Sequence, residues 1–255
     1  MFIAQIDFVI LRKIGGDEQD QVIYSLLAFF LHDGRIGKDY QILKTDKVFS
    51  IFTKIPDLDA FENLENHKNI PDFLKKLTEL NLSQPNYQIL GKTSDLVANC
   101  ECQNSSAFIL YTGIWSSSVT PLYCIDCFNV IPLYRLPRRE FGDFFNVYIW
   151  QQDYISCDSL QIHCKTGERF GLREMLEYRS SLSQRGLEIC AEIKQLTNKP
   201  CYYFLYKYRG KSWKIEQERK CPKCNKEWKL EAKLHKLFDF KCDDCQLLGN
   251  IADSI

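Results

Sequence analysis

The chain has 255 residues, enough for two or three small domains, and its 45% hydrophobic and 26% charged residues are typical of a soluble globular protein. Its formal net charge is zero, which excludes a uniformly basic or acidic protein. The longest apolar run, residues 22–31, is too short to span a bilayer. The N-terminal stretch carries Asp7 and no basic n-region, unlike a signal peptide. We therefore expect a cytoplasmic protein without a membrane segment.

Residues 1–90 predict an N-terminal mixed α/β domain. The first helix is expected over 17–34, with acidic residues in its first turn and Gly34 at its end. The second is expected over 70–81, with Pro71 in its first turn. Three segments have the pattern of strands: 2–11, 47–55 and 86–92.

The remaining residues divide into three regions. Residues 91–137 predict short strands and turns around a group of cysteines, and 138–198 predict helices, over 139–155 and 181–197. In the second helix, one face is expected to carry Leu187, Cys190, Ile193 and Leu196. Residues 199–255 predict a strand, a glycine-containing turn and a second strand, followed by a cysteine-rich ribbon. The fold class expected from these regions is α+β.

Twelve cysteines are present, and eight of them fall into two groups. In a reducing compartment, paired cysteines indicate metal more often than disulfides. The first group is Cys100, Cys102, Cys124 and Cys127, and the second is Cys221, Cys224, Cys242 and Cys245. The other four are Cys157, Cys164, Cys190 and Cys201.

The second group predicts a zinc ribbon. Its two Cys-x-x-Cys pairs, 17 residues apart, supply the four thiolates of a tetrahedral zinc site. Pro222 fixes one backbone angle of the first turn, and Asn225 tolerates the left-handed conformation expected after Cys224. The spacer is long enough for one strand out and one back, and four of its side chains can cover the metal: Trp228, Leu230, Phe238 and Phe240. A thioredoxin-like dithiol is the alternative. That motif has a helix after it and needs no second cysteine pair, whereas here residues 225–230 do not have a helical pattern and a second pair does follow.

The first group predicts a second zinc site. Its pairs lie 21 residues apart, and the one-residue spacer of "CEC" is less common in zinc knuckles. Glu101, Asp126 or water could complete its ligand shell, and the alternative is a set of small buried thiols. His163 and Cys164, with Cys157 before them, fit a core or surface role better than a third site. Cys190 and Cys201 are expected to be buried thiols.

The text "TPLYCIDCFNVIPLYRLP" (120–137), together with residues 181–210 and 221–250, resembles a family of uncharacterised bacterial proteins. Its members are described as containing a zinc ribbon and as candidate nucleic-acid-binding proteins. The resemblance covers residues 85–250 and implies zinc at the second cysteine group, with no catalytic activity. Asn225 stands where a glycine is expected after "CPKC".

Charge is distributed unevenly along the chain. Residues 199–241 hold 13 Lys or Arg and 5 Asp or Glu, a balance of +8, which leaves −8 for the rest. Nine cations of this segment could attract phosphates: Lys211, Lys214, Arg219, Lys220, Lys223, Lys226, Lys229, Lys233 and Lys236. A row of aromatics could stack bases if it were exposed, and is otherwise core: Tyr202, Phe204, Tyr206 and Tyr208.

Three functions remain open from these observations. The first is binding of DNA or RNA through the basic C-terminal region. The second is a zinc-stabilised protein-interaction adaptor or inhibitor that binds a protein partner and no nucleic acid. The third is an enzyme, but the sequence has no P-loop, nucleophile elbow, HExxH or deaminase pattern. We therefore expect a zinc-ribbon protein that acts by binding and is not an enzyme.

Overall fold

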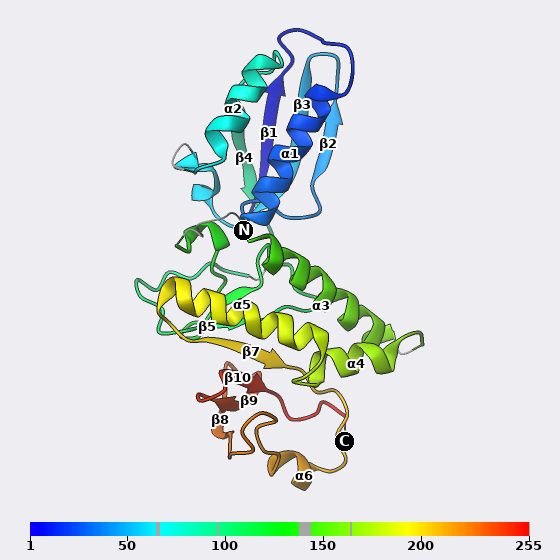
Figure 1. The fold of residues 1–255 in the computed structure, drawn as a ribbon, viewed down its shortest axis with the longest axis vertical. Helices are drawn as coiled ribbons and strands as arrows, with labels where there is room; N and C mark the ends of the chain where they lie inside the picture. Colours follow the sequence, from blue (N-terminus) through cyan, green and yellow to red (C-terminus); the bar gives the residue numbers. More distant parts are fainter. Residues whose placement is uncertain (65–66, 96, 138–143, 164, 255) are drawn as a thin grey trace. The chain divides into compact units, whose positions relative to one another are not determined.

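The structure is a computed structural model that describes residues 1–64, 67–95, 97–137, 144–163 and 165–254. Helices and strands are mixed throughout, which confirms the α+β class (Figure 1). The chain forms two compact units. The first unit comprises Met1–Asn99, Ser117–Thr120 and Pro132–Phe145. The second comprises Cys100–Ser116, Pro121–Ile131 and Asn146–Ile255.

The first unit is a four-stranded antiparallel sheet with two helices. Its elements are β1 (Phe2–Val9), α1 (Glu18–His32), β2 (Gln41–Lys44), β3 (Val48–Ile55), a 3₁₀ turn η1 (Leu58–Phe61), α2 (Ile70–Glu79) and β4 (Asn86–Lys92), with a second 3₁₀ turn, η3 (Leu133–Arg135). The strand order is β2-β3-β1-β4. This β-α-β-β-α-β succession is the ferredoxin-like arrangement. The sequence did not predict β2, a short strand with three exposed residues.

Alternating residues of β1 build the core of this unit. Ala4, Ile6 and Phe8 are fully buried and belong to one cluster with the apolar residues of α1 and α2. In the register, Ile6 lies opposite Ile51 of β3. The period of two therefore directs every second side chain toward the helices. The first helix ends as expected: Asp33 is its C-cap, and Gly34 has a φ of 70°.

The second unit is a six-stranded mixed sheet with helices. Its elements are β5 (Phe108–Leu110), β6 (Leu122–Cys124), α3 (Phe145–His163), α4 (Glu168–Leu176), α5 (Ser181–Thr197), β7 (Cys201–Leu205), α6 (Trp213–Gln217), β8 (Lys229–Leu234), β9 (Phe238–Cys242) and β10 (Leu247–Gly249). The strand order is β6-β5-β7-β10-β9-β8. The central strand β7 is parallel to β5 and β10, and the other pairs are antiparallel.

Both faces of β7 are buried. On one face, Tyr203 packs edge-on against Trp150 of α3, with ring centroids 5.9 Å apart. On the other, Phe204 contacts Tyr111 and Phe238. Tyr202 and Phe204 are therefore core residues, which confirms the core alternative for these two and excludes them from base stacking, whereas Tyr206 and Tyr208 are half-buried. A strand that is covered on both sides has a continuous apolar sequence without alternation. The sequence therefore could not show which face of β7, if any, is exposed.

Two predicted details of this unit differ in the structure. Where a second strand is expected after the glycine turn, the structure has the short helix α6. Its N-cap is Ser212, whose hydroxyl accepts a hydrogen bond from the backbone N–H of Ile215. In α5, Cys190 and Ile193 are buried as expected, whereas Leu187 and Leu196 are half-buried. The beginning of the helix predicted at 139 lies outside the described residues. Among the described helices, none is long and apolar enough to cross a membrane.

Candidate metal centres

The four cysteines of the ribbon converge on one point, and we call them the ribbon tetrad: Cys221, Cys224, Cys242 and Cys245. Their sulfur atoms all lie within 4.8 Å of one another. Cys224 Sγ and Cys242 Sγ are 3.7 Å apart. Four sulfurs around a tetrahedral zinc at about 2.3 Å would be separated by about 3.8 Å. The arrangement can therefore hold a metal ion without rearrangement of the backbone.

A backbone knuckle presents the first two ribbon sulfurs. The N–H of Asn225 donates to the carbonyl of Cys221 at 2.9 Å, and the N–H of Cys221 donates to the carbonyl of Lys226 at 3.0 Å. Asn225 has a φ of 58°, the left-handed conformation expected at this position. The backbone N–H of Lys226 donates to Cys224 and, with neighbouring thiols, lowers the pKa of Cys224 to about 7. The knuckle thus favours the thiolate, the form that binds metal.

The aromatic residues of the ribbon hairpin are buried. Trp228 and Phe240 stack with ring centroids 5.0 Å apart, and both are buried, as is Phe238. Leu230 is half-buried. Gly249 lets the indole approach the backbone, because a Cβ at this residue would lie 2.9 Å from Trp228 Cη2. Cys221, Cys242 and Cys245 are buried as well, so solvent has little access to them.

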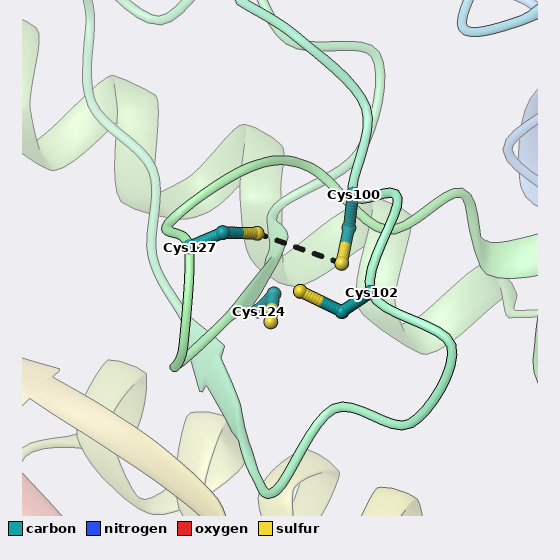
Figure 2. Close-up of side chains that lie close together, drawn as sticks. All are labelled: Cys100, Cys102, Cys124 and Cys127. Carbon is teal, nitrogen blue, oxygen red and sulfur yellow. Dashed lines mark hydrogen bonds between the residues drawn. The ribbon is translucent and has the colours of Figure 1, made fainter.

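The other four cysteines also converge, and we call them the central tetrad: Cys100, Cys102, Cys124 and Cys127 (Figure 2). Their sulfurs lie within 4.8 Å of one another, and those of Cys127 and Cys100 are 3.6 Å apart. Cys124 is buried at the end of β6, whereas Cys102 and Cys127 are exposed. The central tetrad is therefore equally compact but much more open to solvent than the ribbon tetrad.

The central tetrad has the same backbone knuckle as the ribbon. The N–H of Phe128 donates to the carbonyl of Cys124 at 2.9 Å, and the N–H of Cys124 donates to the carbonyl of Asn129 at 2.9 Å. Phe128 has a φ of 57°, and Gln246, which follows the last ribbon pair, has 54°. All three Cys-x-x-Cys turns therefore end in a left-handed residue. The shared backbone conformation indicates that "CIDC" and "CPKC" present their two sulfurs in the same way.

Neighbouring acidic groups do not belong to the converging ligand set. The carboxylate of Asp126 accepts hydrogen bonds from the backbone N–H of Ser106, at 2.7 Å, and from its hydroxyl. The backbone N–H of Asp126 donates to Cys124 Sγ at 3.3 Å. Glu101 is exposed. In the described residues the shell therefore consists of four sulfurs, and Asp126 stabilises the turn that presents Cys124.

Aromatic contacts of Phe128 join the two cysteine regions. Phe128, which follows Cys127, stacks on His235 at the tip of the β8–β9 hairpin, with ring centroids 4.9 Å apart. His235 Nε2 lies 2.5 Å from the carbonyl oxygen of Ile125 inside the central knuckle. Phe128 also contacts Phe238, the first residue of β9. The sequence did not indicate this contact, since its partners are more than 100 residues apart.

The remaining cysteines lie outside both tetrads. Cys157, Cys190 and Cys201 are buried, as expected. His163 is exposed at the end of α3, with Nδ1 2.6 Å from the carbonyl of Ser159. Cys164 lies outside the described residues, and among those described no third group of metal-ligand side chains converges. The sulfur separations of 3.6 and 3.7 Å in the tetrads also exceed the 2.05 Å of a disulfide bond.

We expect the protein purified under reducing, zinc-replete conditions to contain two zinc ions per chain, which a chelator removes in two phases. The central tetrad should lose its metal first, because Cys102 and Cys127 are exposed. Elemental analysis gives the stoichiometry, and a chromogenic chelator gives the rates. Cys102→Ser should abolish only the fast phase. A single zinc per chain in the unmodified protein would contradict a metal at the central tetrad.

Residues 199–241, the basic segment, carry less unpaired positive charge than their sequence suggests. Seven of its 13 cations form ion pairs: Lys207, Arg209, Arg219, Lys220, Lys226, Lys233 and Lys241. Two of the acidic partners, Asp243 and Asp244, come from the last cysteine turn, beyond the segment. Lys223, Lys229 and Lys236 are exposed and form no ion pair within the described part of the chain. These three lysines are the clearest phosphate-binding candidates on the ribbon.

Family models match both regions that contain the tetrads. A domain of unknown function, DUF2310, matches residues 102–206, and a second, DUF8594, matches residues 210–254. An uncharacterised protein of Haemophilus influenzae is 25% identical over 241 residues, covering 92% of each chain. A second one from the same organism is 31% identical over 166 residues, covering 65% of this chain and 81% of its own.

Among solved structures, the chain is similar to SnoaB, described as a cofactor-independent oxygenase from Streptomyces nogalater. The TM-score is 0.30 at 15% identity, over 37% of this chain and 95% of SnoaB, and for its N63A mutant the score is 0.28. The expectation that the protein is not an enzyme is corrected on this finding, because the structural neighbour is an enzyme. At this TM-score the likeness assigns no activity or site to the chain.

Proposed function

The chain belongs to the uncharacterised DUF2310/DUF8594 family, and we propose a function for it. In this proposal the chain is a zinc protein whose ribbon binds single-stranded DNA or RNA. The observation that carries the proposal is the set of exposed lysines without ion pairs on the ribbon that contains the ribbon tetrad. Lys223 lies within the first knuckle, between Cys221 and Cys224, and Lys229 is the first residue of β8. Lys236 lies in the turn between β8 and β9.

Zinc is the metal that the ligands favour. Four thiolates at tetrahedral spacing suit zinc or iron, and structural zinc sites commonly use four cysteines. A complete shell of four protein sulfurs leaves the metal no open position, so its role at each tetrad is structural. Binding to nucleic acid would then depend on the side chains that the folded ribbon presents.

The lysines suit a phosphate backbone better than base edges. An exposed ammonium on a flexible side chain contacts phosphates as a point charge and carries little sequence information. The buried state of Tyr202 and Phe204 removes the aromatic platform that sequence-tolerant stacking would need on β7. We therefore propose binding that is electrostatic and weakly dependent on base sequence.

We expect affinity for a labelled single-stranded oligonucleotide to fall steeply with salt, with a slope of about −0.7 in log–log form for each phosphate contacted. Lys223→Glu combined with Lys229→Glu should weaken binding and reduce the slope, because both lysines lack acidic partners. Fluorescence anisotropy at several salt concentrations measures both quantities. The matched control is Lys68→Glu with Lys92→Glu, which makes the same charge change on exposed lysines of the first unit.

Two results would contradict the proposal. One is the absence of binding even at low salt. The other is an equal loss of affinity in the ribbon variant and the control, which would reflect net charge alone. A protein partner recovered after nuclease treatment, together with either result, would instead support the adaptor function.

A further inference from the structure

A pocket of about 410 Å³ opens beside the first ribbon knuckle, within the second unit. Its volume lies in the range of small-molecule ligand sites, roughly 300–1,000 Å³. Three segments form its wall: the end of α4 with the loop after it, the end of β7, and the approach to the knuckle. The lining residues are Leu176, Glu177, Tyr178, Arg179, Leu205, Lys207, Arg219, Lys220 and Pro222.

Positive charge dominates this lining. Four cations face one carboxylate, Glu177. At the inner end, Lys207 Nζ lies 2.6 Å from Glu216 Oε1, and Arg219 Nε lies 3.6 Å from Glu216 Oε2. Two cations thus share a single carboxylate, and Glu216 is almost fully buried. Buried Asp239 also acts on Arg219, so these two cations are largely compensated by acidic groups of the chain itself.

Arg219 is held in place yet incompletely satisfied. Its Nη2 donates to the carbonyl of Asn250, and its guanidinium lies 4.6 Å from the ring centre of Phe240. Its buried Nε and the Oε2 of Glu216 both lack a hydrogen-bond partner among the described residues, and these two atoms lie 3.6 Å from each other. Burial lowers the pKa of Arg219, which means that its surroundings oppose the charge. Glu216 is therefore the anion that this buried cation faces, and Arg219 forms part of the wall of the pocket.

Two further cations stand at the exposed edge. Arg179 is exposed and forms no ion pair in the part of the chain that the structure describes. Lys220 contacts Glu227, but both side chains are largely exposed, so this pair contributes little and can be exchanged for another anion. An anion entering the pocket would meet Arg179 and Lys220, the two lining cations that are exposed. The apolar wall of Leu176, Leu205 and Pro222 would receive an uncharged part of the same ligand.

We propose that this pocket binds a nucleotide through its phosphate group, with Arg179 and Lys220 as the entry contacts. The nucleotide is one unit of a single strand or a free mononucleotide, and both present the same phosphate ester. In its strand form the proposal rests on the proposed function. In its free form it does not, since Lys223, Lys229 and Lys236 are not among the residues that line the pocket.

The test uses the full zinc-loaded protein with Arg179→Glu and Lys220→Glu, singly and together. Arg219 is left intact because it packs in the aromatic core. The probes are a labelled oligothymidylate and thymidine monophosphate, followed by anisotropy and by calorimetry. We expect each substitution to weaken binding roughly tenfold, the magnitude of one lost hydrogen bond to a charged group. Arg169→Glu is the matched control, because Arg169 is also exposed and lies in the second unit, outside the pocket.

The outcomes separate the two proposals. Weaker binding of either probe in the pocket variants, but not in Arg169→Glu, supports the pocket. Binding of thymidine monophosphate that the variants abolish, without binding of the oligothymidylate, supports the pocket and contradicts the proposed function. Oligothymidylate binding that responds to Lys223 and Lys229 but not to Arg179 or Lys220 overturns the pocket and leaves the proposed function intact.

Discussion

Replacing Cys221 by serine is expected to remove the metal from the ribbon tetrad and to unfold the ribbon from the first knuckle to the end of β9. Cys221 is 1% exposed, so a water ligand cannot take its place without opening the surrounding structure. Structural zinc contributes on the order of 10 kcal/mol to the folding of isolated zinc-finger peptides. This is comparable to the whole free energy of unfolding of a domain, about 5–15 kcal/mol.

Hydrogen exchange measured by mass spectrometry locates this effect. Amide protection should be lost across β8 and β9, while the first unit, which has its own core, keeps its protection. Cys157→Ala is the control, because it removes a buried thiol that belongs to neither tetrad. A Cys221→Ser protein with full metal content and unchanged protection would show that the ribbon does not depend on this ligand.

Gly186→Ala is the second large effect that we expect, with a loss of at least about 2 kcal/mol in the free energy of unfolding of the second unit. Helix propensity alone predicts the opposite sign, since alanine is favoured over glycine by about 1 kcal/mol inside a helix. A Cβ on Gly186, however, would lie 2.1 Å from Tyr203 Cε2 and 2.9 Å from Trp150 Nε1. Both rings are fully buried and have no free space to move into.

Chemical denaturation of the two proteins measures this difference. Gly91→Ala in β4 is the control, because a Cβ there meets no atom within 4 Å. Its stability should change by less than about 0.5 kcal/mol, as at an ordinary surface position. An unchanged or raised stability in Gly186→Ala would mean that α5 can shift away from β7, and that the close approach at this glycine is not needed.

Sequence reasoning located the cysteines because their chemistry is local. A Cys-x-x-Cys turn brings two sulfurs together whatever surrounds it, and Asn225 indicated the left-handed residue that ends the first turn. The same conformation at Phe128 and Gln246 could not be predicted, because neither residue type favours it. The sequence does contain one indication of α6, because Ser212 is a residue type that caps helices.

The distribution of free charge could not be predicted in the same way. Lys226 pairs with Asp244 and Lys233 with Asp239 only because β9 brings the chain back beside β8. Such pairs depend on the register of a hairpin, which counting charges along the chain does not reveal. The pocket beside the first knuckle is non-local as well. Two of its lining residues, Arg179 and Lys220, are separated in the sequence by α5, β7 and α6.

The parallel pairing of β7 has a consequence for how the second unit assembles. Phe108 lies opposite Cys201, and Leu247 lies opposite Tyr203, so both neighbours of the central strand come from distant parts of the chain. Loops of this length must close before the pairing contributes any stability, and such topologies fold slowly. During synthesis, β7 leaves the ribosome with one edge still unpaired until β10 follows it. A nascent chain that stalls before residue 247 would therefore expose an apolar strand edge, the kind of surface that aggregates and that chaperones bind.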